Sequence, residues 1–212
     1  MDKEILTVYG SFESEKIIEK SRFLTYSCHV ESEEEARAFI AKIRSQHSLA
    51  THVCYAFVAD KLGNLQRFSD DGEPQGTAGV PMLEVLKAKK LFETAVAVVR
   101  YFGGIKLGAG GLVRAYSSSV AENLAGADIR SLQICKEMEI EVDYTGIDGV
   151  QKFVSSHTCS LLSTDYGEKV RFLVAVKKAD FEGFRRELID YMQGRVEIKE
   201  GKEYYAAFKI QA

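Results

Sequence analysis

A glycine-dense segment between Val99 and Tyr116 constrains this chain of 212 residues more than any other feature. Five glycines fall within the nine residues of the range 103–111. An apolar run from Thr94 precedes the segment, and an amphipathic stretch from Leu112 follows it. Glycine loses more backbone entropy on folding than any other residue, so this density indicates positive φ angles or a close approach to the backbone. The pattern predicts a strand that enters a glycine loop, and a helix that begins at the loop's end.

This arrangement is a common way to build an anion site, because free backbone N–H groups and the helix dipole both point at the ligand. We expect cationic side chains at the edges of the loop, and glycine backbone that a partner can approach closely. The predicted ligand or phosphate contacts are Arg100, Gly103, Gly104, Lys106, Gly108, Gly110 and Arg114. A tight strand-to-helix turn that binds nothing is the alternative for the same residues.

A second cluster is acidic, with Asp70, Asp71 and Glu73 placing three carboxylates in four residues. Such a cluster could bind a divalent cation or supply a general base. Acidic residues with Gly and Pro are also typical of turns, and an acid near a helix start is stabilising. We therefore predict no metal site and no cofactor. A third interpretation is that Asp71 or Glu73 pairs with Arg100 or Arg114 across a cleft and fixes the two loops.

Five other residues could support the site or take part in catalysis. His52 and Cys54 are two apart on a predicted strand and share one face, which allows a Cys–His nucleophile but is more typical of core residues. Tyr101 and Phe102 could stack on bases, as could Tyr116, with at least one of the three in the core. His52, Tyr101 and Phe102 are retained as supporting residues, and no catalytic residue is assigned.

The amino-acid composition indicates which classes of protein this chain can belong to. With 46% hydrophobic and 28% charged residues, the chain is typical of globular proteins with a substantial core. A net charge of −3 argues against a general basic field but leaves room for a local nucleic-acid-binding patch. The four cysteines are scattered singly, which disfavours disulfides and structural zinc. Residues Met1 to Leu6 carry no signal-like apolar run, and no run approaches the roughly 18 residues of a membrane span. We expect a cytoplasmic protein.

Hydrophobic periodicity and turn residues predict the elements of the first part of the chain. Ser32 and Glu35 fit a capping box at the start of a helix that runs to about Gln46. Strands are expected at 12–18, 22–30, 52–59, 65–69 and 94–101, and a second helix from Pro81 to about Lys90. The helix after the glycine loop is expected to run to about Ala125, with Leu112, Tyr116, Val120 and Leu124 as its buried stripe.

The second part of the chain shows a different pattern. Strands are expected at 137–144, 159–166, 168–176 and 195–208, the last with an irregular middle, and helices at 147–157 and 180–192. The resulting order βαββαβ is the ferredoxin-like arrangement. The fold class predicted is α+β with two domains, residues 1–130 and 131–212.

Four motifs together resemble the YigZ/IMPACT family. They are Lys20-Ser-Arg-Phe, His52-x-Cys54-x-Ala56, Asp70-Asp-Gly-Glu-Pro-x-Gly-Thr-Ala-Gly and Arg100-Tyr-Phe-Gly-Gly-x-x-Leu-Gly-x-Gly-Gly-Leu-x-Arg-Ala-Tyr. They cover roughly residues 15 to 125, and neither long motif departs from the family pattern. The resemblance implies a first domain like the second domain of ribosomal protein S-five, a sandwich of strands and helices. It also implies a ferredoxin-like second domain similar to the fifth domain of elongation factor G.

The resemblance further implies a link to translation. Eukaryotic relatives oppose activation of a starvation-responsive translation kinase by competing for its activator, through an additional N-terminal domain that is not in this sequence, so we do not carry that role over. We favour a translation-associated binding protein that contacts RNA, the ribosome or a translation factor through the glycine loop, with no membrane partner and no indicated DNA specificity. Two alternatives stay open. One is an enzyme that acts on a small phosphorylated ligand, with Asp71 or Glu73 as base or magnesium ligand, and the other is a protein-interaction module. The enzyme is disfavoured because the loop lacks the P-loop arrangement and no nucleophile–base pair is clear.

Overall fold

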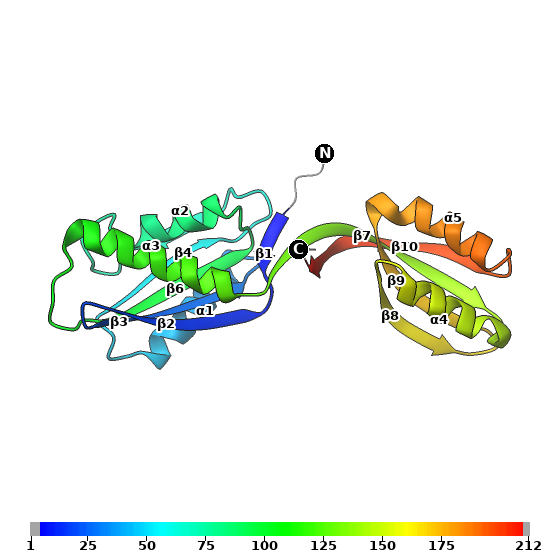
Figure 1. Ribbon diagram of the computed structural model, residues 1–212, viewed down its shortest axis with the longest axis horizontal. Helices are drawn as coiled ribbons and strands as arrows, with labels where there is room; N and C mark the ends of the chain where they lie inside the picture. The colour runs from blue at the N-terminus through cyan, green and yellow to red at the C-terminus, as the bar shows by residue number, and fades with distance from the viewer. Residues whose placement is uncertain (1–4, 210–212) are drawn as a thin grey trace. The chain divides into compact units, whose positions relative to one another are not determined.

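The computed structural model describes residues 5–209, which form two compact units (Figure 1). The first unit ends at Ser131 and also takes in the described residues 208 and 209, whereas the second spans Leu132–Ala207. Both units combine helices with an antiparallel sheet, which confirms the predicted two-domain α+β class. The structure does not describe residues 1–4 and 210–212. The outer ends of the two predicted domains, and most of the N-terminal segment expected to lack a signal peptide, therefore lie outside the described residues.

The sheet of the first unit has the order β2-β3-β6-β4-β5, and every neighbouring pair is antiparallel. The strands are β2 Ser11–Ile18, β3 Ser21–His29, β4 His52–Val58, β5 Gln66–Ser69 and β6 Thr94–Tyr101. The central strand β6 is buried along almost its whole length, which explains its continuous apolar sequence.

Three helices cover the two faces of this sheet (Figure 1). On β6, Val96 and Val98 pack with helices α2 (Gly79–Ala88) and α3 (Gly108–Gly126). The alternate residues of β6 face α1 (Glu33–Gln46) on the other side. The predicted stripe of α3 is buried at all four positions, Leu112, Tyr116, Val120 and Leu124. The first unit is therefore a three-layer sandwich with one helix on one face and two on the other.

Helix α1 begins and ends as predicted, whereas helix α2 begins earlier than predicted. Ser32 caps the helix as predicted, because its Oγ accepts a hydrogen bond from Glu35 N at 3.2 Å. The return bond of the predicted capping box differs, since Glu35 Oε2 accepts from Glu31 N at 2.8 Å. Helix α2 begins at Gly79, two residues before the predicted Pro81, and it ends at Ala88. A short strand β1 (Ile5–Val8), which the sequence did not predict, places Val8 in the core.

The second unit has the predicted element order βαββαβ. Strand β9 lies between β7 and β8, and β10 pairs with β7, while α4 and α5 supply the core side chains on one face. The elements are β7 Ile129–Val142, α4 Ile147–Ser156, β8 Cys159–Tyr166, β9 Val170–Lys177, α5 Phe181–Tyr191 and β10 Glu197–Lys209, with single 3₁₀ turns at Tyr144–Gly146 and Lys178–Asp180.

Two strands of this unit are longer than predicted. Strand β7 starts at Ile129, eight residues before the predicted position 137. Strand β10 runs without a break where an irregular middle was expected. A Cβ added at Gly201 would lie 2.7 Å from Glu137 Cβ, so this glycine permits close packing of β10 on β7 and does not mark a break. Among the described residues, no helix has the length and apolarity needed to cross a membrane.

Candidate functional site

The glycine loop joins the end of β6 at Tyr101 to the start of α3 at Gly108. No side chain caps the N-terminus of this 19-residue helix, and its first turn contains no acidic residue. The backbone at Gly108, Ala109 and Gly110 is exposed. The N–H groups and the positive end of the helix dipole are therefore open to an anion.

The structure explains why some positions of the loop need glycine, and the reason differs from one position to the next. A Cβ added at Gly103 would lie 2.1 Å from the backbone C and O of Lys20, so the loop runs directly against the turn between β2 and β3. Gly104 has a φ of +85°, in the left-handed region that favours glycine. A Cβ at Gly110 would meet nothing within 4 Å. The fold therefore does not require glycine at position 110, and the backbone there is open to a partner.

Beneath the loop lies a buried polar cluster centred on Glu73. Arg100 Nη1 donates to Glu73 Oε1 at 2.6 Å, and the two side chains are 5% and 4% exposed. Tyr116 Oη donates to the same oxygen at 2.8 Å. Burial raises the pKa of the Tyr116 hydroxyl, which therefore stays protonated as a donor. Arg100 Nη2 also donates to Ser21 Oγ at 3.3 Å, and the guanidinium lies 5.4 Å from the centroid of the Phe23 ring.

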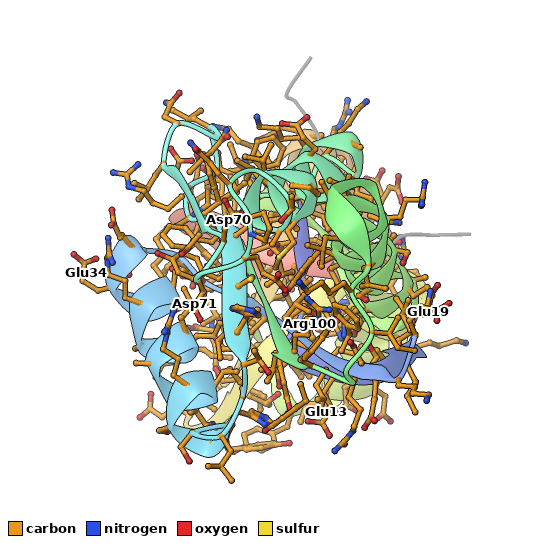
Figure 2. All side chains as sticks on the ribbon, turned by 90° about the vertical axis from the view of Figure 1, so that its left-hand side faces the viewer. Glu13, Glu19, Glu34, Asp70, Asp71 and Arg100 are labelled. Atoms are coloured by element: carbon orange, nitrogen blue, oxygen red, sulfur yellow. The ribbon has the colours of Figure 1, made fainter. Side chains whose placement is uncertain are left out.

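The position of Arg100 corrects one expectation and meets another. We expected its cationic head at the edge of the loop, but Figure 2 shows it inside the unit, near the loop that carries Asp70 and Asp71. The reason is strand alternation, because residue 100 points to the same face of β6 as Val98, and α3 covers that face. The predicted ion pair between the acidic loop and Arg100 is present, through Glu73.

Asp70 connects the acidic loop to the start of α2. Its Oδ2 accepts from Gly76 N at 2.8 Å, and its Oδ1 accepts from Ala78 N at 3.0 Å and Gly79 N at 2.8 Å. Burial alone would raise the pKa of this carboxyl, but the three backbone donors outweigh it and hold the pKa below its usual value. Asp70 therefore caps α2 from outside the helix, which explains why the helix starts before Pro81.

Asp71 connects the same loop to α1 and β4. Its Oδ1 accepts from Arg44 Nη2 at 2.7 Å, and its Oδ2 accepts from Val53 N at 2.6 Å. Its backbone oxygen accepts from His52 Nδ1 at 2.8 Å. With Glu73 bound to Arg100, all three carboxylates of the loop are held by donors of the protein. These contacts favour the interpretation of the loop as a structural clasp over a cation site.

Cys54 shares a strand face with His52, as predicted, but its environment is unsuited to nucleophilic chemistry. The thiol donates to Asp70 O at 2.9 Å, and burial raises its pKa to about 12. The thiolate is the reactive form of cysteine, so a raised pKa leaves the side chain inert near neutral pH. Cys54 is a packing residue of the α3 face.

Of the three aromatic residues considered for stacking, one is available at the loop surface. Phe102 is 46% exposed, whereas Tyr116 is fully buried. Tyr101 is half-buried, and its hydroxyl hydrogen-bonds His47 Nδ1 at 2.9 Å. The opposite ring nitrogen of His47 meets Tyr26 Oη at 2.8 Å, so Tyr101 belongs to the contacts beneath α1.

One cation at this site was missed. Lys20 lies in the two-residue turn between β2 and β3, with φ +62°, and its backbone packs against Gly103. The side chain is exposed and, within the described residues, makes no ion pair, as is also true of Lys106 and Arg114. Turns of this kind usually carry Asn or Gly, so the residues of this turn gave no signal that the chain folds back there against the loop.

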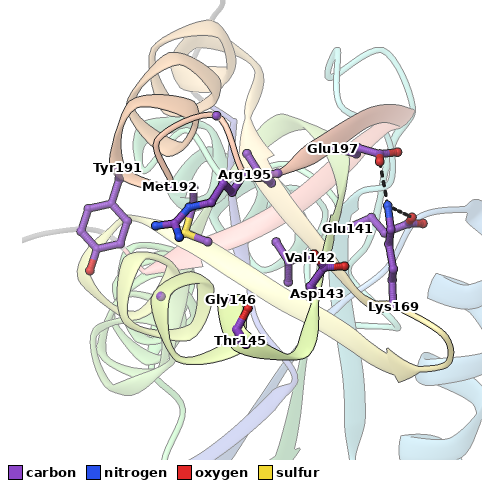
Figure 3. Close-up of a pocket in the computed structure, with 13 residues that line it drawn as sticks. Glu141, Val142, Asp143, Thr145, Gly146, Lys169, Tyr191, Met192, Arg195 and Glu197 are labelled. Atoms are coloured by element: carbon purple, nitrogen blue, oxygen red, sulfur yellow. Dashed lines mark hydrogen bonds and ion pairs between the residues drawn. The ribbon is translucent and has the colours of Figure 1, made fainter.

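The second unit contains a hollow of about 510 Å³ between the end of β7, the start of α4 and the segment after α5. Figure 3 shows the ammonium of Lys169 between the carboxylates of Glu141 and Glu197, at 3.3 and 2.7 Å. Arg195 donates to Gln193 Oε1 at 3.3 Å. Both cations already have partners within the protein, and we assign no ligand to this hollow.

Comparisons with known proteins give two family matches in separate parts of the chain. Residues 19–124 match the Impact N-terminal domain, and residues 140–195 match a domain of unknown function, DUF1949. The IMPACT family member YvyE of Bacillus subtilis is 42% identical over 94% of this chain and 92% of its own length. The chain belongs to the IMPACT family. The family member YigZ of Escherichia coli is 36% identical over 85% of this chain and 90% of its own.

A yeast protein and a solved structure are also similar to this chain. The protein IMPACT homolog of Saccharomyces cerevisiae is 30% identical over 42% of this chain and 35% of its own length. A crystal structure described as that of a hypothetical protein has a TM-score of 0.61 and 33% identity, over 93% of this chain and 97% of that one. The Impact N-terminal match of residues 19–124 contains the acidic loop, the buried Glu73–Arg100 pair and the glycine loop.

Proposed function

We propose that this IMPACT family member is a translation-associated binding protein of the cytoplasm that contacts RNA through a glycine-loop face. The face is formed by Lys20, Phe102, Gly104, Lys106, Gly110 and Arg114. The observation that carries the proposal is the uncapped, exposed start of α3 beside cations with no ion pair within the described part of the chain.

The chemistry of this face suits a nucleic-acid backbone. Phosphate contacts supply most of the affinity for nucleic acid, and they need local cations and N–H donors, not a positive protein overall. Lys106 and Arg114 supply the charge, and the open backbone at Gly110 lets a phosphate approach the first turn of α3. Phe102 offers an exposed ring on which a base can stack.

Arg100 has an indirect role in this account. It sits at the end of β6, where its ion pair with Glu73 fixes the strand from which the loop emerges. Ser21 Oγ accepts from both Arg100 and Gly103 N, at 3.3 and 3.2 Å, and so joins the pair to the loop backbone. The cluster thus supports the shape of the face without touching the partner.

The link to translation is supported by family membership, which relates the chain to the yeast IMPACT homolog. The contacts of the acidic loop weigh against the enzyme alternative, because Asp71 and Glu73 are held by Arg44 and Arg100. The raised pKa of Cys54, about 12, weighs in the same direction.

A polypeptide partner is a second candidate, favoured by apolar side chains on strand β8 of the second unit. Leu161, Leu162 and Tyr166 are 48%, 45% and 65% exposed. Exposed apolar groups gathered on one strand are typical of protein-interaction surfaces. This candidate uses a surface other than the glycine-loop face, so the two can be tested separately.

Fluorescence anisotropy of labelled single-stranded and structured RNA with the full chain, at low salt, tests the proposal. The variant Lys106→Ala/Arg114→Ala removes two charges from the face. The variant Lys42→Ala/Lys89→Ala removes the same charge from exposed positions elsewhere on the first unit and is the matched control. We expect the first variant to weaken binding and the control to leave it near that of the wild type. Equal binding by all three proteins would exclude the face, and no binding by the wild type would shift the account to a polypeptide partner.

A further inference from the structure

Three potential metal ligands meet at the end of the first sheet that is opposite to the glycine loop. The register of β3 and β6 pairs Arg22 with Tyr101 at the loop end, and His29 with Thr94 at the other end. Glu93 directly precedes Thr94, and Glu31 follows His29 by two residues. One donor atom from each of His29, Glu31 and Glu93 lies within 4.8 Å of the other two.

Glu93 is the unusual member of this group, because its side chain is only 3% exposed. One carboxylate oxygen, Oε1, accepts from Lys61 Nζ at 2.6 Å. The other, Oε2, is buried and has no hydrogen-bond partner. A buried anionic oxygen without a partner is costly, so this atom is expected to have a ligand that the chain itself does not provide.

The contacts of His29 fix how its imidazole ring lies in this group. Thr7 Oγ1 donates its single proton to the backbone oxygen of Glu93 at 3.0 Å, since a carbonyl can only accept. His29 Nδ1, which lies 2.8 Å from Thr7 Oγ1, is then the donor in that contact. The other ring nitrogen, Nε2, lies 3.2 Å from Glu31 Oε1. Thr7 thus holds the ring so that Nε2 lies beside the carboxylate of Glu31.

We propose that His29, Glu31 and Glu93 bind a divalent first-row transition-metal ion, with Zn²⁺ the best match to one imidazole and two carboxylates. Lys61 neutralises one of the two carboxylates, which leaves the group one net negative charge for the cation. Zinc ligands lie about 2.0–2.2 Å from the metal, so the donors must close in slightly. Glu31 can make this movement because its side chain is 64% exposed. Thr7 then orients the imidazole from its far nitrogen, as outer-shell partners of metal-bound histidines do.

The second unit offers a matched control with the same histidine–carboxylate pair. His157 Nε2 lies 3.1 Å from Glu187 Oε2, with side-chain exposures of 29% and 66%, against 29% and 64% for His29 and Glu31. Its Nδ1 is likewise engaged, by Phe153 O at 2.8 Å. Within the described residues, no third potential metal ligand lies close enough to complete a site with His157 and Glu187, whereas Glu93 does so for His29 and Glu31.

Isothermal titration calorimetry of the metal-free, reduced full chain with ZnCl₂ tests the site. The variants are His29→Gln and Glu31→Gln, with His157→Gln as the control and circular dichroism as the check of folding. Glu93 is left unchanged because its loss would also strip Lys61 of its carboxylate. We expect one Zn²⁺ per chain, an affinity lower by more than about tenfold in both ligand variants, and an unchanged affinity in the control. Thr7→Val is expected to lower the affinity about 10–100-fold.

Three results would overturn the proposal. The first is the absence of Zn²⁺ binding by the wild-type chain. The second is binding that His29→Gln and Glu31→Gln leave unchanged, which would place the ion on the free cysteines or elsewhere. The third is an equal loss in His157→Gln, which would show that a surface histidine–carboxylate pair suffices. A variant that has lost its fold is replaced by His29→Asn or Glu31→Ala and judged by the same criteria.

Discussion

Arg100 and Glu73 form an ion pair of 2.6 Å in the interior of the first unit, where their side chains are 5% and 4% exposed. The pair joins the end of the central strand to the acidic loop, and Tyr116 of α3 donates to the same carboxylate oxygen. Three segments that are distant in the sequence therefore meet at one buried charge pair. Ser21 Oγ, which accepts from both Arg100 and Gly103 N, connects this junction to the backbone of the glycine loop.

Breaking the pair is expected to destabilise the fold. Arg100→Ala or Glu73→Ala leaves an uncompensated buried charge, which costs about 3–5 kcal/mol. Urea unfolding of each variant measures the change. Arg22→Ala, which breaks the exposed pair of Arg22 with Glu15, is the control and should change stability far less. If Arg100→Ala and Arg22→Ala lowered the free energy of unfolding by the same small amount, the result would contradict the burial of the Arg100–Glu73 pair.

The two ends of the glycine loop are expected to respond in opposite directions to a methyl group. Gly103→Ala would place Cβ against the backbone of Lys20, at 2.1 Å, and should destabilise the first unit strongly. Gly110→Ala meets open space in the first turn of α3 and should stabilise it by roughly 0.5–1 kcal/mol, the usual gain of Ala over Gly in a helix. Thermal unfolding distinguishes the two, and equal melting temperatures would show that the loop does not pack on the turn as described.

The cap supplied by Asp70 predicts a dependence of stability on pH. The folded-state pKa of Asp70 lies below its usual value of 3.8, so its contribution is complete above that value and is lost as the pH falls through the folded-state pKa. Asp70→Asn removes the charge and one of the two accepting oxygens. The stability difference between wild type and variant, from urea unfolding, should be constant near neutral pH and shrink below about pH 4. A difference that persists unchanged at pH 2.5 would contradict the assignment.

The environments of Cys54, which is buried, and Cys28, which is partly buried, predict the reactivity of their thiols. Desolvation raises the pKa of both Cys54 and Cys28 to about 12, so neither is a thiolate at pH 8. Treatment with iodoacetamide and mass spectrometry should find both unmodified in the native chain and modified in urea. Modification of Cys54 at the same rate in the two conditions would reopen a nucleophilic role for it.

Most helices and strands could be predicted from the sequence, because the residue patterns that indicate them are local. The helix cap at Ser32 and the four-residue spacing of the α3 stripe depend only on neighbouring residues. The burial of Arg100 could not be predicted in this way, since an arginine that ends a strand is usually exposed. Its burial follows from the face of β6 that α3 covers. The early start of α2 likewise depends on Asp70, which reaches it from a preceding loop.

The candidate sites show the same limit. The glycine loop was visible as a motif, but the packing of the turn at Lys20 against it depends on the register of β2 and β3. The group of His29, Glu31 and Glu93 has no spacing motif at all. It forms because β3 and β6 are antiparallel neighbours, which brings residues 64 positions apart to one end of the sheet.

The salt dependence of RNA binding tests the central claim most directly. Counterion release gives a log–log slope of roughly −0.7 for each phosphate neutralised on a single strand. Lys106→Ala/Arg114→Ala removes two such contacts, so its slope should be shallower than that of the wild type by about 1.4, with Lys42→Ala/Lys89→Ala unchanged. RNA binding through the glycine-loop face predicts this difference in slope. Identical slopes for the wild type and both variants would contradict it.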